Sequence, residues 1–196
     1  MDTLYQTLMS VLSTAFYDDL LKTDKDRADQ VQKAGCPHCG GKLHAHHRLR
    51  KAAGLPQTLG DEHRVRFAFR CGRRSCRKHV SPDSVRFQGR KLYLGVVMAL
   101  LTAKQCGLTV SGETLTAIGV SRRTLGRWRQ WWQKRVPETS FWREKMGKFR
   151  APVNTATLPA SLLRQRVGEK IEDQLIWLLR FIAPLGCDAA FRQKAA

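Results

Sequence analysis

The sequence has no apolar run long enough to cross a membrane. Its best candidate, residues 92–103, falls well short of the roughly twenty apolar residues that a bilayer span needs. The N-terminus also lacks the basic segment followed by a long apolar run that marks a secretory signal. We therefore expect an unexported, cytoplasmic protein with no membrane partner.

Acidic residues are scarce compared with basic ones. The chain has 35 Lys and Arg against 16 Asp and Glu, a formal net charge of +19. Residues 64–150 carry 21 Lys or Arg and four Asp or Glu, a net charge of +17, whereas the first thirty residues are acidic on balance. Such an excess favours a polyanionic partner, nucleic acid first and an anionic membrane surface second. The alternative is a generally basic protein with a solvated surface.

Signatures of catalysis are missing as well. The sequence shows no acidic cluster, no glycine-rich phosphate loop and no nucleophile with a neighbouring base. We therefore expect a binding protein rather than an enzyme. A metal-dependent nuclease, or a subunit of one, is the catalytic alternative.

Cysteine is present in two close pairs. Cys36 and Cys39 form the first pair, and Cys71 and Cys76 form the second. In an unexported chain such pairs favour metal binding over disulfides. Four thiolates satisfy a tetrahedral Zn²⁺ ion and leave no position for water, so we predict a structural zinc site at these four residues. The two remaining cysteines, Cys106 and Cys187, are expected to be buried, unreactive thiols.

Histidines follow the first cysteine pair closely. His44, His46 and His47 form a small cluster, and His79 lies three residues after Cys76. Any of them could replace a cysteine ligand or build a second metal site. We favour the simpler interpretation, in which they are solvated loop histidines near phosphates. The segment over residues 44–62 is expected to form an irregular loop.

Hydrophobic periodicity predicts most of the secondary structure. Residues 64–70 alternate polar and apolar side chains, the pattern of a strand that leads into Cys71. Leucines and other apolar residues recur at helical spacing in three segments, and Ser111 can begin a further helix. The predicted helices span residues 3–21, 91–104, 111–118, 121–136 and 159–182, with residues 22–34 either extending the first helix or forming a linker.

The segment around Gly119 has the features of a helix-turn-helix. Ser121 can cap a helix whose buried stripe would be Leu125, Trp128, Trp132 and Val136. The opposite face carries residues suited to base edges and phosphates, and further arginines lie near the second cysteine pair. The predicted DNA contacts are Ser121, Arg122, Arg123, Arg127 and Gln130 on the helix, and Arg64, Arg66, Arg73 and Arg74 near the cysteines. The alternative is an ordinary three-helix unit with a charged outer face.

The combination of these motifs resembles a known family region. Cys36-Pro37-His38-Cys39-Gly40-Gly41, the basic strand ending at Arg70-Cys71 and the helix-turn-helix resemble the N-terminal zinc-ribbon regions of bacterial insertion-sequence transposases over residues 35–136. In that family the ribbon and the helix-turn-helix bind transposon ends, and a separate domain with three acidic metal ligands cuts DNA. Only about sixty residues follow Val136 here. The resemblance therefore implies an accessory or regulatory DNA-binding role.

These observations together predict a mainly α fold with a small β zinc ribbon. The ribbon is followed by a three-helix helix-turn-helix unit and flanked by terminal amphipathic helices, with boundaries at residues 1–34, 35–84, 85–137 and 138–196. We expect a nucleoid-associated protein that binds double-stranded DNA of a mobile element and acts with a transposase or recombinase. The terminal helices would either pack within the chain or mediate a homodimer. The main alternative is an RNA-binding or ribosome-associated zinc ribbon.

Overall fold

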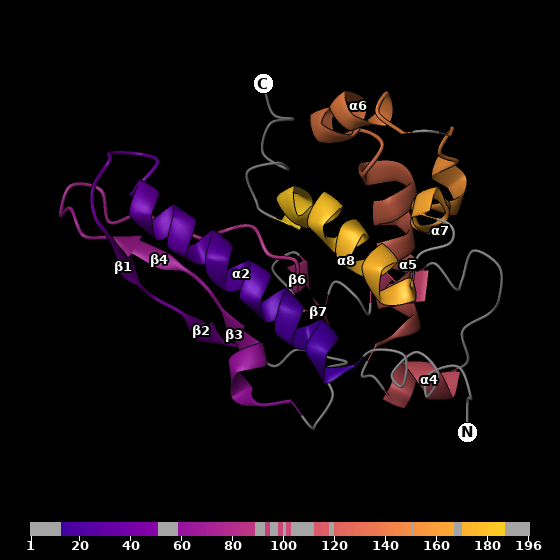
Figure 1. Ribbon diagram of the computed structural model, residues 1–196, viewed down its shortest axis with the longest axis horizontal. Helices are drawn as coiled ribbons and strands as arrows, with labels where there is room; N and C mark the ends of the chain where they lie inside the picture. The colour runs from indigo at the N-terminus through magenta and orange to yellow at the C-terminus, as the bar shows by residue number, and fades with distance from the viewer. Residues whose placement is uncertain are drawn as a thin grey trace.

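A narrow arm and a wider helical body make up the molecule (Figure 1). The computed structural model describes residues 13–50, 59–88, 93–94, 98–99, 101–102, 112–117, 120–149, 151–166 and 170–186. Most of the described residues are helical, and the strands are short and antiparallel, so the predicted mainly α fold with a small β part is confirmed at that level. None of the described helices combines the length and the hydropathy that a membrane crossing requires.

The longest element is helix α2 (Thr14–Ala34), which runs along the arm. It begins where the Ser13 hydroxyl accepts a hydrogen bond from the Phe16 N–H at 3.2 Å, and it ends at Gly35, whose φ of 81° breaks the helical conformation. The helix predicted over residues 3–21 is confirmed from residue 14, while residues 1–12 lie outside the described part. Residues 22–34 extend the helix and do not form a linker.

Short antiparallel strands line one side of α2. Strands β1 (Leu43–Ala45), β4 (Phe69–Cys71) and β5 (His79–Val80) form a three-stranded sheet in the order β1-β4-β5. Strand β2 (Arg48–Leu49) pairs with β3 (Val65–Arg66). The two pairings share one register, because His44 faces Arg70 and Arg48 faces Arg66. Residues 43–50 and 64–71 therefore form one long two-stranded ribbon.

The ribbon corrects two sequence predictions. The strand predicted over residues 64–70 is confirmed for Val65–Arg66 and from Phe69 onward, but Arg64 belongs to a 3₁₀ turn, η1 (Asp61–Arg64). The irregular loop expected over residues 44–62 is wrong for residues 44–49, which lie in β1, β2 and the link between them. These side chains are exposed on both faces of the strand, and their backbone is extended because it pairs with residues 65–70.

A small hairpin replaces part of a predicted helix at the start of the body. Strands β6 (Phe87–Gln88) and β7 (Tyr93–Leu94) pair antiparallel, so the helix predicted over residues 91–104 is wrong at β7. Within the described residues, 98–99 and 101–102 are helical as predicted. Gly95 follows β7 directly in the sequence, and glycine disfavours the continuation of a helix.

The next helices follow the predicted pattern closely. After α4 (Gly112–Ala117) comes α5 (Arg122–Gln130), which continues through one π-helical turn, η2 (Trp131–Arg135), before α6 (Ser140–Met146). The predicted cap is confirmed, because the Ser121 hydroxyl accepts a hydrogen bond from the Thr124 N–H at 3.1 Å. The predicted core stripe is also confirmed: its members Leu125, Trp128, Trp132 and Val136 are all buried.

The C-terminal segment differs from prediction in one respect. The single helix expected over residues 159–182 is instead α7 (Ala160–Leu163), the 3₁₀ turn η4 (Arg164–Arg166) and α8 (Ile171–Ile182). Lys170 has an extended backbone (ψ 146°) and starts α8 as a separate helix. Of the apolar residues predicted to line this segment, Leu162, Leu175, Leu178 and Leu179 are fully buried, whereas Leu163 is half-buried and Ile171 is exposed. Two further 3₁₀ turns, η3 (Thr155–Thr157) and η5 (Ala183–Gly186), flank these helices.

Two apolar clusters form the core, and α2 contributes to both. Phe16, Tyr17 and Leu20, from the first half of α2, pack into the large cluster of the helical body. Ala28, from the second half, packs in a small cluster beneath the sheet, whose other members are Cys36, Leu43, Phe69 and Cys71. The terminal helices α2 and α8 also meet within the chain, where the Ser13 N–H and hydroxyl both donate to Glu172 at 2.9 Å. The buried apolar residues of both helices are thus used in intramolecular packing.

A buried ion pair lies between the two clusters. Asp24 and Arg86 are almost fully buried, and the Arg86 Nε donates to the Asp24 carboxylate at 2.8 Å. The carboxylate also accepts hydrogen bonds from the Ser84 hydroxyl and, at 2.8 Å, from the Val85 N–H. The remaining Arg86 nitrogens donate to the carbonyls of Glu62, His63 and Val65. Helix α2, the base of the ribbon and residues 84–87 are therefore joined by one hydrogen-bonded network.

Replacing Asp24 with Asn should destabilise the protein strongly. The substitution keeps the side-chain shape but leaves the Arg86 charge buried without its counter-ion, which costs about 3–5 kcal/mol. Urea unfolding followed by circular dichroism would measure the loss. The exposed Asp26→Asn variant on the same helix is the matched control and should change stability by less than about 0.5 kcal/mol. Equal stability of the two variants would contradict this role for Asp24.

Candidate functional site

The first cysteine pair lies in a tight turn directly after α2. The Gly40 N–H donates to the Cys36 carbonyl at 2.8 Å, and the Cys36 N–H donates to the Gly41 carbonyl at 2.9 Å. Gly40 has a φ of 67°, as expected for the glycine that follows the second cysteine. A side chain at Gly41 would lie 3.1 Å from the Cys71 sulfur, so this glycine permits the close approach of the two cysteine pairs.

The second cysteine pair lies between β4 and β5 and repeats this geometry. Cys71 ends β4, and the Cys76 and Arg77 N–H groups both donate to the Arg73 carbonyl at 3.0 Å. Arg77 has a φ of 48° and is the one described non-glycine residue with a positive φ. It holds the same position after Cys76 that Gly40 holds after Cys39. The wider spacing of the second pair therefore still gives a turn of the same kind.

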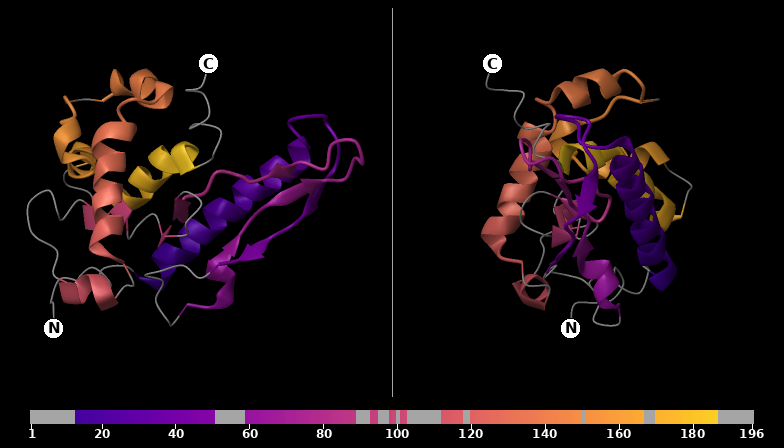
Figure 2. Two further views of the ribbon diagram at one scale, coloured as in Figure 1. Left: turned by 180° about the vertical axis from the view of Figure 1, so that it is seen from behind. Right: turned by 90° about the vertical axis from the view of Figure 1, so that its left-hand side faces the viewer.

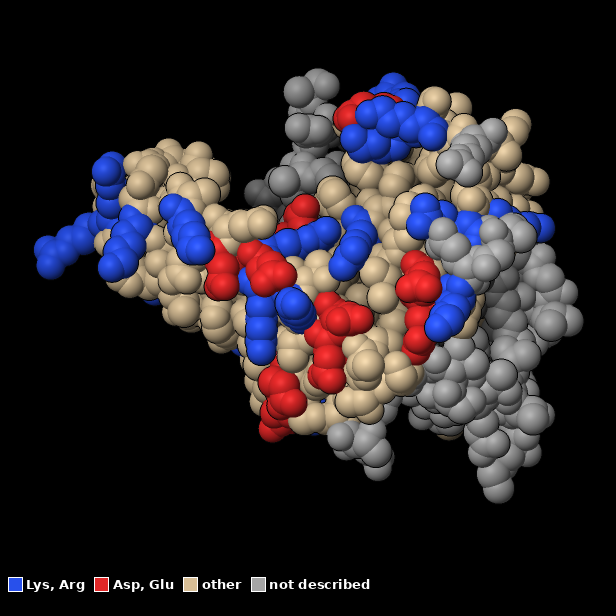
Figure 3. Space-filling model, in the orientation of Figure 1, with Lys and Arg blue, Asp and Glu red and all other residues tan. Residues whose placement is uncertain are grey.

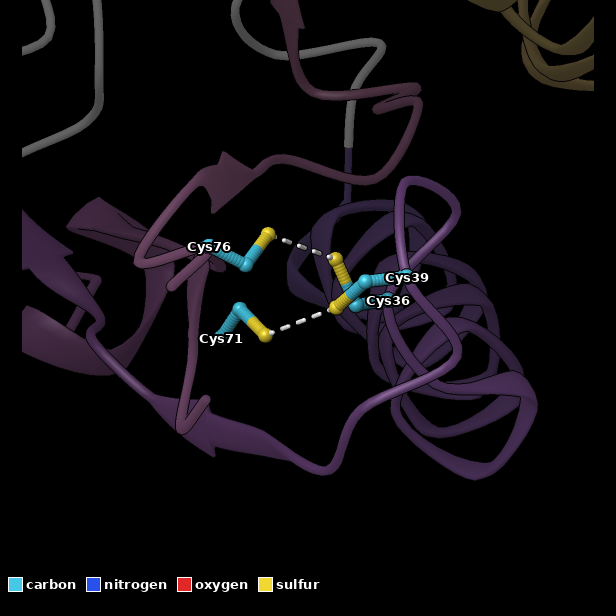
Figure 4. Close-up of side chains that lie close together, drawn as sticks. All are labelled: Cys36, Cys39, Cys71 and Cys76. Atoms are coloured by element: carbon cyan, nitrogen blue, oxygen red, sulfur yellow. Dashed lines mark hydrogen bonds between the residues drawn. The ribbon is translucent and has the colours of Figure 1, made fainter. Parts of the chain in front are cut away.

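The four sulfur atoms converge on one point (Figure 4). All four lie within 4.8 Å of one another, with 3.7 Å between the sulfurs of Cys36 and Cys76 and 3.5 Å between those of Cys39 and Cys71. A tetrahedral ion with metal–sulfur bonds of about 2.3 Å places its sulfurs about 3.8 Å apart. A disulfide would require a sulfur–sulfur distance of about 2.05 Å. The geometry therefore matches a tetrathiolate metal site, and the cysteines could hold a metal ion.

The thiols perturb one another electrostatically. Burial opposes ionisation of Cys36, but the backbone at His38 and the three neighbouring thiols outweigh it and lower its pKa to about 7. Burial raises the pKa of Cys71 to about 12, with the same neighbouring thiols adding to the effect. The pKa of Cys76 is raised as well: the backbone at Lys78 favours the thiolate, but burial and the thiols of Cys39 and Cys36 outweigh it. A bound cation would remove this conflict, because it stabilises all four thiolates together.

The histidines do not complete a second metal site within the described residues. The four cysteines are the only group of three or more metal-ligating side chains that the described residues bring together. His38 is exposed on the first turn, and His44, His46, His47 and His79 are exposed along the ribbon. The His47 ring contacts the backbone of Ala68 at 3.1 Å. Cys106 and Cys187 lie outside the described residues.

The arginines predicted near the cysteines occupy different environments. Arg64 lies 3.5 Å from the Asp61 carboxylate, and Arg66 donates to the Pro82 carbonyl at 2.7 Å, so both have partners within the chain. Arg73 and Arg74 are exposed on the second cysteine turn. Sequence reasoning missed Arg70, which is exposed in the middle of β4. The alternation of Arg70 with the buried Phe69 and Cys71 is the sequence pattern that indicates its exposure.

The predicted contacts on α5 share one open side. Ser121, Arg122, Arg123, Arg127 and Gln130 are all exposed, and the Ser121 hydroxyl also serves as the helix cap. Arg129, which sequence reasoning did not select, is exposed as well. No acidic residue occurs between Arg122 and Arg135, so this helix surface is uniformly basic or neutral.

The strands and α5 lie on the same side of the molecule. Both face the viewer in the left panel of Figure 2, with α2 behind the strands. The opposite side, shown in Figure 3, has acidic and basic groups intermixed over α2. Exposed acidic residues of that helix include Asp18, Asp19, Asp26 and Asp29. The strands and α5, whose surfaces carry basic residues without acidic ones, therefore lie on the side away from α2 (Figure 2).

Comparisons of the chain with protein-family models, with curated proteins and with solved structures find no match.

Loss of one cysteine ligand should release a bound metal and unfold the arm. We expect one metal ion per chain in the purified protein by elemental analysis, and much less after Cys71→Ser, because three thiolates bind far more weakly than four. Hydrogen exchange over residues 36–80 should increase in the same variant, since metal binding is coupled to folding. Acidification should also release the metal, because protons compete for the thiolates.

The matched control is His38→Ala, which removes an exposed side chain between two ligands. It should keep the metal and the wild-type exchange pattern. A Cys71→Ser variant with full metal content and an unchanged arm would show that the cysteines are not ligands.

Proposed function

We propose that this chain binds duplex DNA through its basic side, with a structural Zn²⁺ ion holding the arm in shape. The observation that carries the proposal is that the strands of the arm and helix α5 both form basic surfaces without acidic residues, and that both lie on one side of the molecule (Figure 2). Residues 35–50 and 65–80 contain nine Lys or Arg and no Asp or Glu. A surface of this kind favours a polyanion, because each phosphate contact releases counterions.

The donor set supports zinc as the metal. Four thiolates in a tetrahedron suit Zn²⁺ or iron, and a closed tetrathiolate site is typical of structural zinc. The apolar cluster beneath the sheet has only five buried members, two of which are cysteines. Burial on that scale contributes little to stability, so the arm depends on its metal in the way that small metal-bound domains do.

Helices α4 and α5 support a helix-turn-helix role. Leu115, Val120 and Leu125 are buried between them, and the Val120 N–H donates to the Leu115 carbonyl at 2.9 Å. The run from Arg122 to Arg135 is about 21 Å long, and its exposed arginines and Gln130 have the chemistry for base edges. A major groove of B-DNA admits one α-helix.

The same helix favours DNA over RNA as the partner. The major groove of A-form RNA is too deep and narrow for side chains to reach its base edges. An RNA-binding ribbon would use the arm alone, and α5 would then contribute little. The resemblance to insertion-sequence transposases suggests that the DNA belongs to a mobile element and that a transposase or recombinase is the partner.

Replacing Arg127 with Ala should weaken binding to a selected target sequence. The loss should be about 1–3 kcal/mol if Arg127 contacts a base edge, with little change for random duplexes. Target sites would be selected from a random duplex pool and affinities measured by fluorescence anisotropy. Selection of no preferred sequence would overturn the specificity, and tighter binding to structured RNA would favour the RNA-binding alternative.

Replacing Arg70 with Ala should weaken binding to all duplexes alike. A phosphate contact carries no sequence information, and its loss should reduce the slope of log affinity against log salt by about 1. Lys25→Ala, an exposed change on the opposite side, is the matched control and should leave both affinity and slope unchanged. Equal effects of the two variants would mean that the strand side does not face the DNA.

A further inference from the structure

The open face of the sheet carries a row of three aligned basic side chains. His44 on β1 faces Arg70 on β4, and Arg70 faces His79 on β5. All three are exposed, whereas their neighbours Leu43, Phe69 and Cys71 point to the opposite face and pack with Ala28 of α2. One residue from each strand thus contributes to a single cross-strand row.

Two more side chains extend this row. The His46 ring lies 5.1 Å from the His79 ring, and the Arg48 Nη2 lies 3.2 Å from the His46 Nε2. We name His44, His46, Arg48, Arg70 and His79 the ribbon row. The salt bridges among the described residues involve none of the five.

The residues that flank the ribbon row on its own strands are basic or neutral. Lys42 and Lys78 are exposed just before β1 and β5, and Arg66 on β3 is directed to the Pro82 carbonyl. His47 is held by the Ala68 backbone. The acidic residues of α2, such as Asp29, belong to the helix on the other face of the sheet.

Such an arrangement of like charges is unfavourable without a counter-ion. Like charges directly opposite one another on a sheet are destabilising. Burial lowers the pKa of His79, and the charges of His46, Arg70 and Arg48 lower it further. The free protein therefore holds His79 back from protonation. An anion on this face would reverse the effect by offsetting the repulsion.

We propose that the ribbon row binds the phosphate backbone of duplex DNA, and that binding tightens as the pH falls because its histidines take up protons when phosphates dock. The inference rests on the proposed DNA binding and adds to it a named contact surface and a form of regulation. The direction follows from linkage. Because protons are taken up when DNA binds, the affinity for DNA rises as the pH falls, by up to about tenfold per pH unit for each proton taken up.

The experiment compares the affinity of the full chain for a labelled duplex of random sequence at about pH 6 and about pH 8, either side of the ordinary histidine pKa of about 6.5. Wild-type protein should bind several-fold to more than tenfold more tightly at the lower pH. The combined variant His44→Gln, His46→Gln and His79→Gln should keep its pH 8 affinity within about twofold and lose the pH dependence. Titration calorimetry in two buffers of different ionisation enthalpy should show proton uptake for wild type only.

The control His38→Gln changes an exposed histidine outside the row and should keep the wild-type pH dependence. Metal content is measured at both pH values, so that loss of the ion is not mistaken for loss of binding. Duplex binding that is independent of pH, or equally pH-dependent in the combined variant, overturns the ribbon row and leaves the proposed function standing. Absence of duplex binding at both pH values overturns both.

Discussion

The Asp24–Arg86 ion pair is the contact on which the relative placement of arm and body depends. Asp24 lies at the middle of α2, between the half that packs into the helical body and the half that packs beneath the sheet. Its partner Arg86 ties down three carbonyls at the base of the ribbon, and the buried His63 adds a 3.2 Å contact to Asp18 of the same helix. A buried ion pair contributes little net stability, because desolvation offsets the attraction. We infer that its main effect here is geometric: it fixes the direction in which the arm projects.

The four cysteines act at the other end of the same arm. The ion pair anchors the base of the ribbon, and the cysteine cluster holds its tip to the end of α2. Between these points the sheet has one covered face and one open face. The covered face meets a helix on which acidic and basic residues are intermixed (Figure 3), whereas the open face carries basic residues without acidic ones. This asymmetry of charge across a thin sheet would orient the open face of the arm toward a polyanion.

Local signals explain what the sequence could predict. The cysteine spacing, the Ser121 cap and the stripe from Leu125 to Val136 each depend on residues only a few positions apart, and all three agree with the structure. The strand at residues 44–49 could not be predicted, because its partners lie sixteen or more residues away at Val65 to Arg70 and its own side chains are all exposed. The ion pair was equally hidden, since Asp24 and Arg86 are 62 residues apart. The split between α7 and α8 depends on the extended backbone of Lys170, which apolar periodicity does not report.

A rigid frame changes what the two basic surfaces can do together. Two contacts on one rigid body act as a single bivalent binder, since the first contact places the second at a high effective concentration. The metal would then contribute to binding without touching DNA, because a tetrathiolate ion has no free position and acts only by keeping the arm folded. On this argument, loss of the metal removes the contribution of the arm and leaves that of α5. Loss of the ion pair leaves both surfaces present but no longer fixed relative to each other. The two losses should therefore have different effects. Loss of the metal would reduce the number of phosphates contacted, and loss of the ion pair would reduce the gain in affinity from contacting them simultaneously.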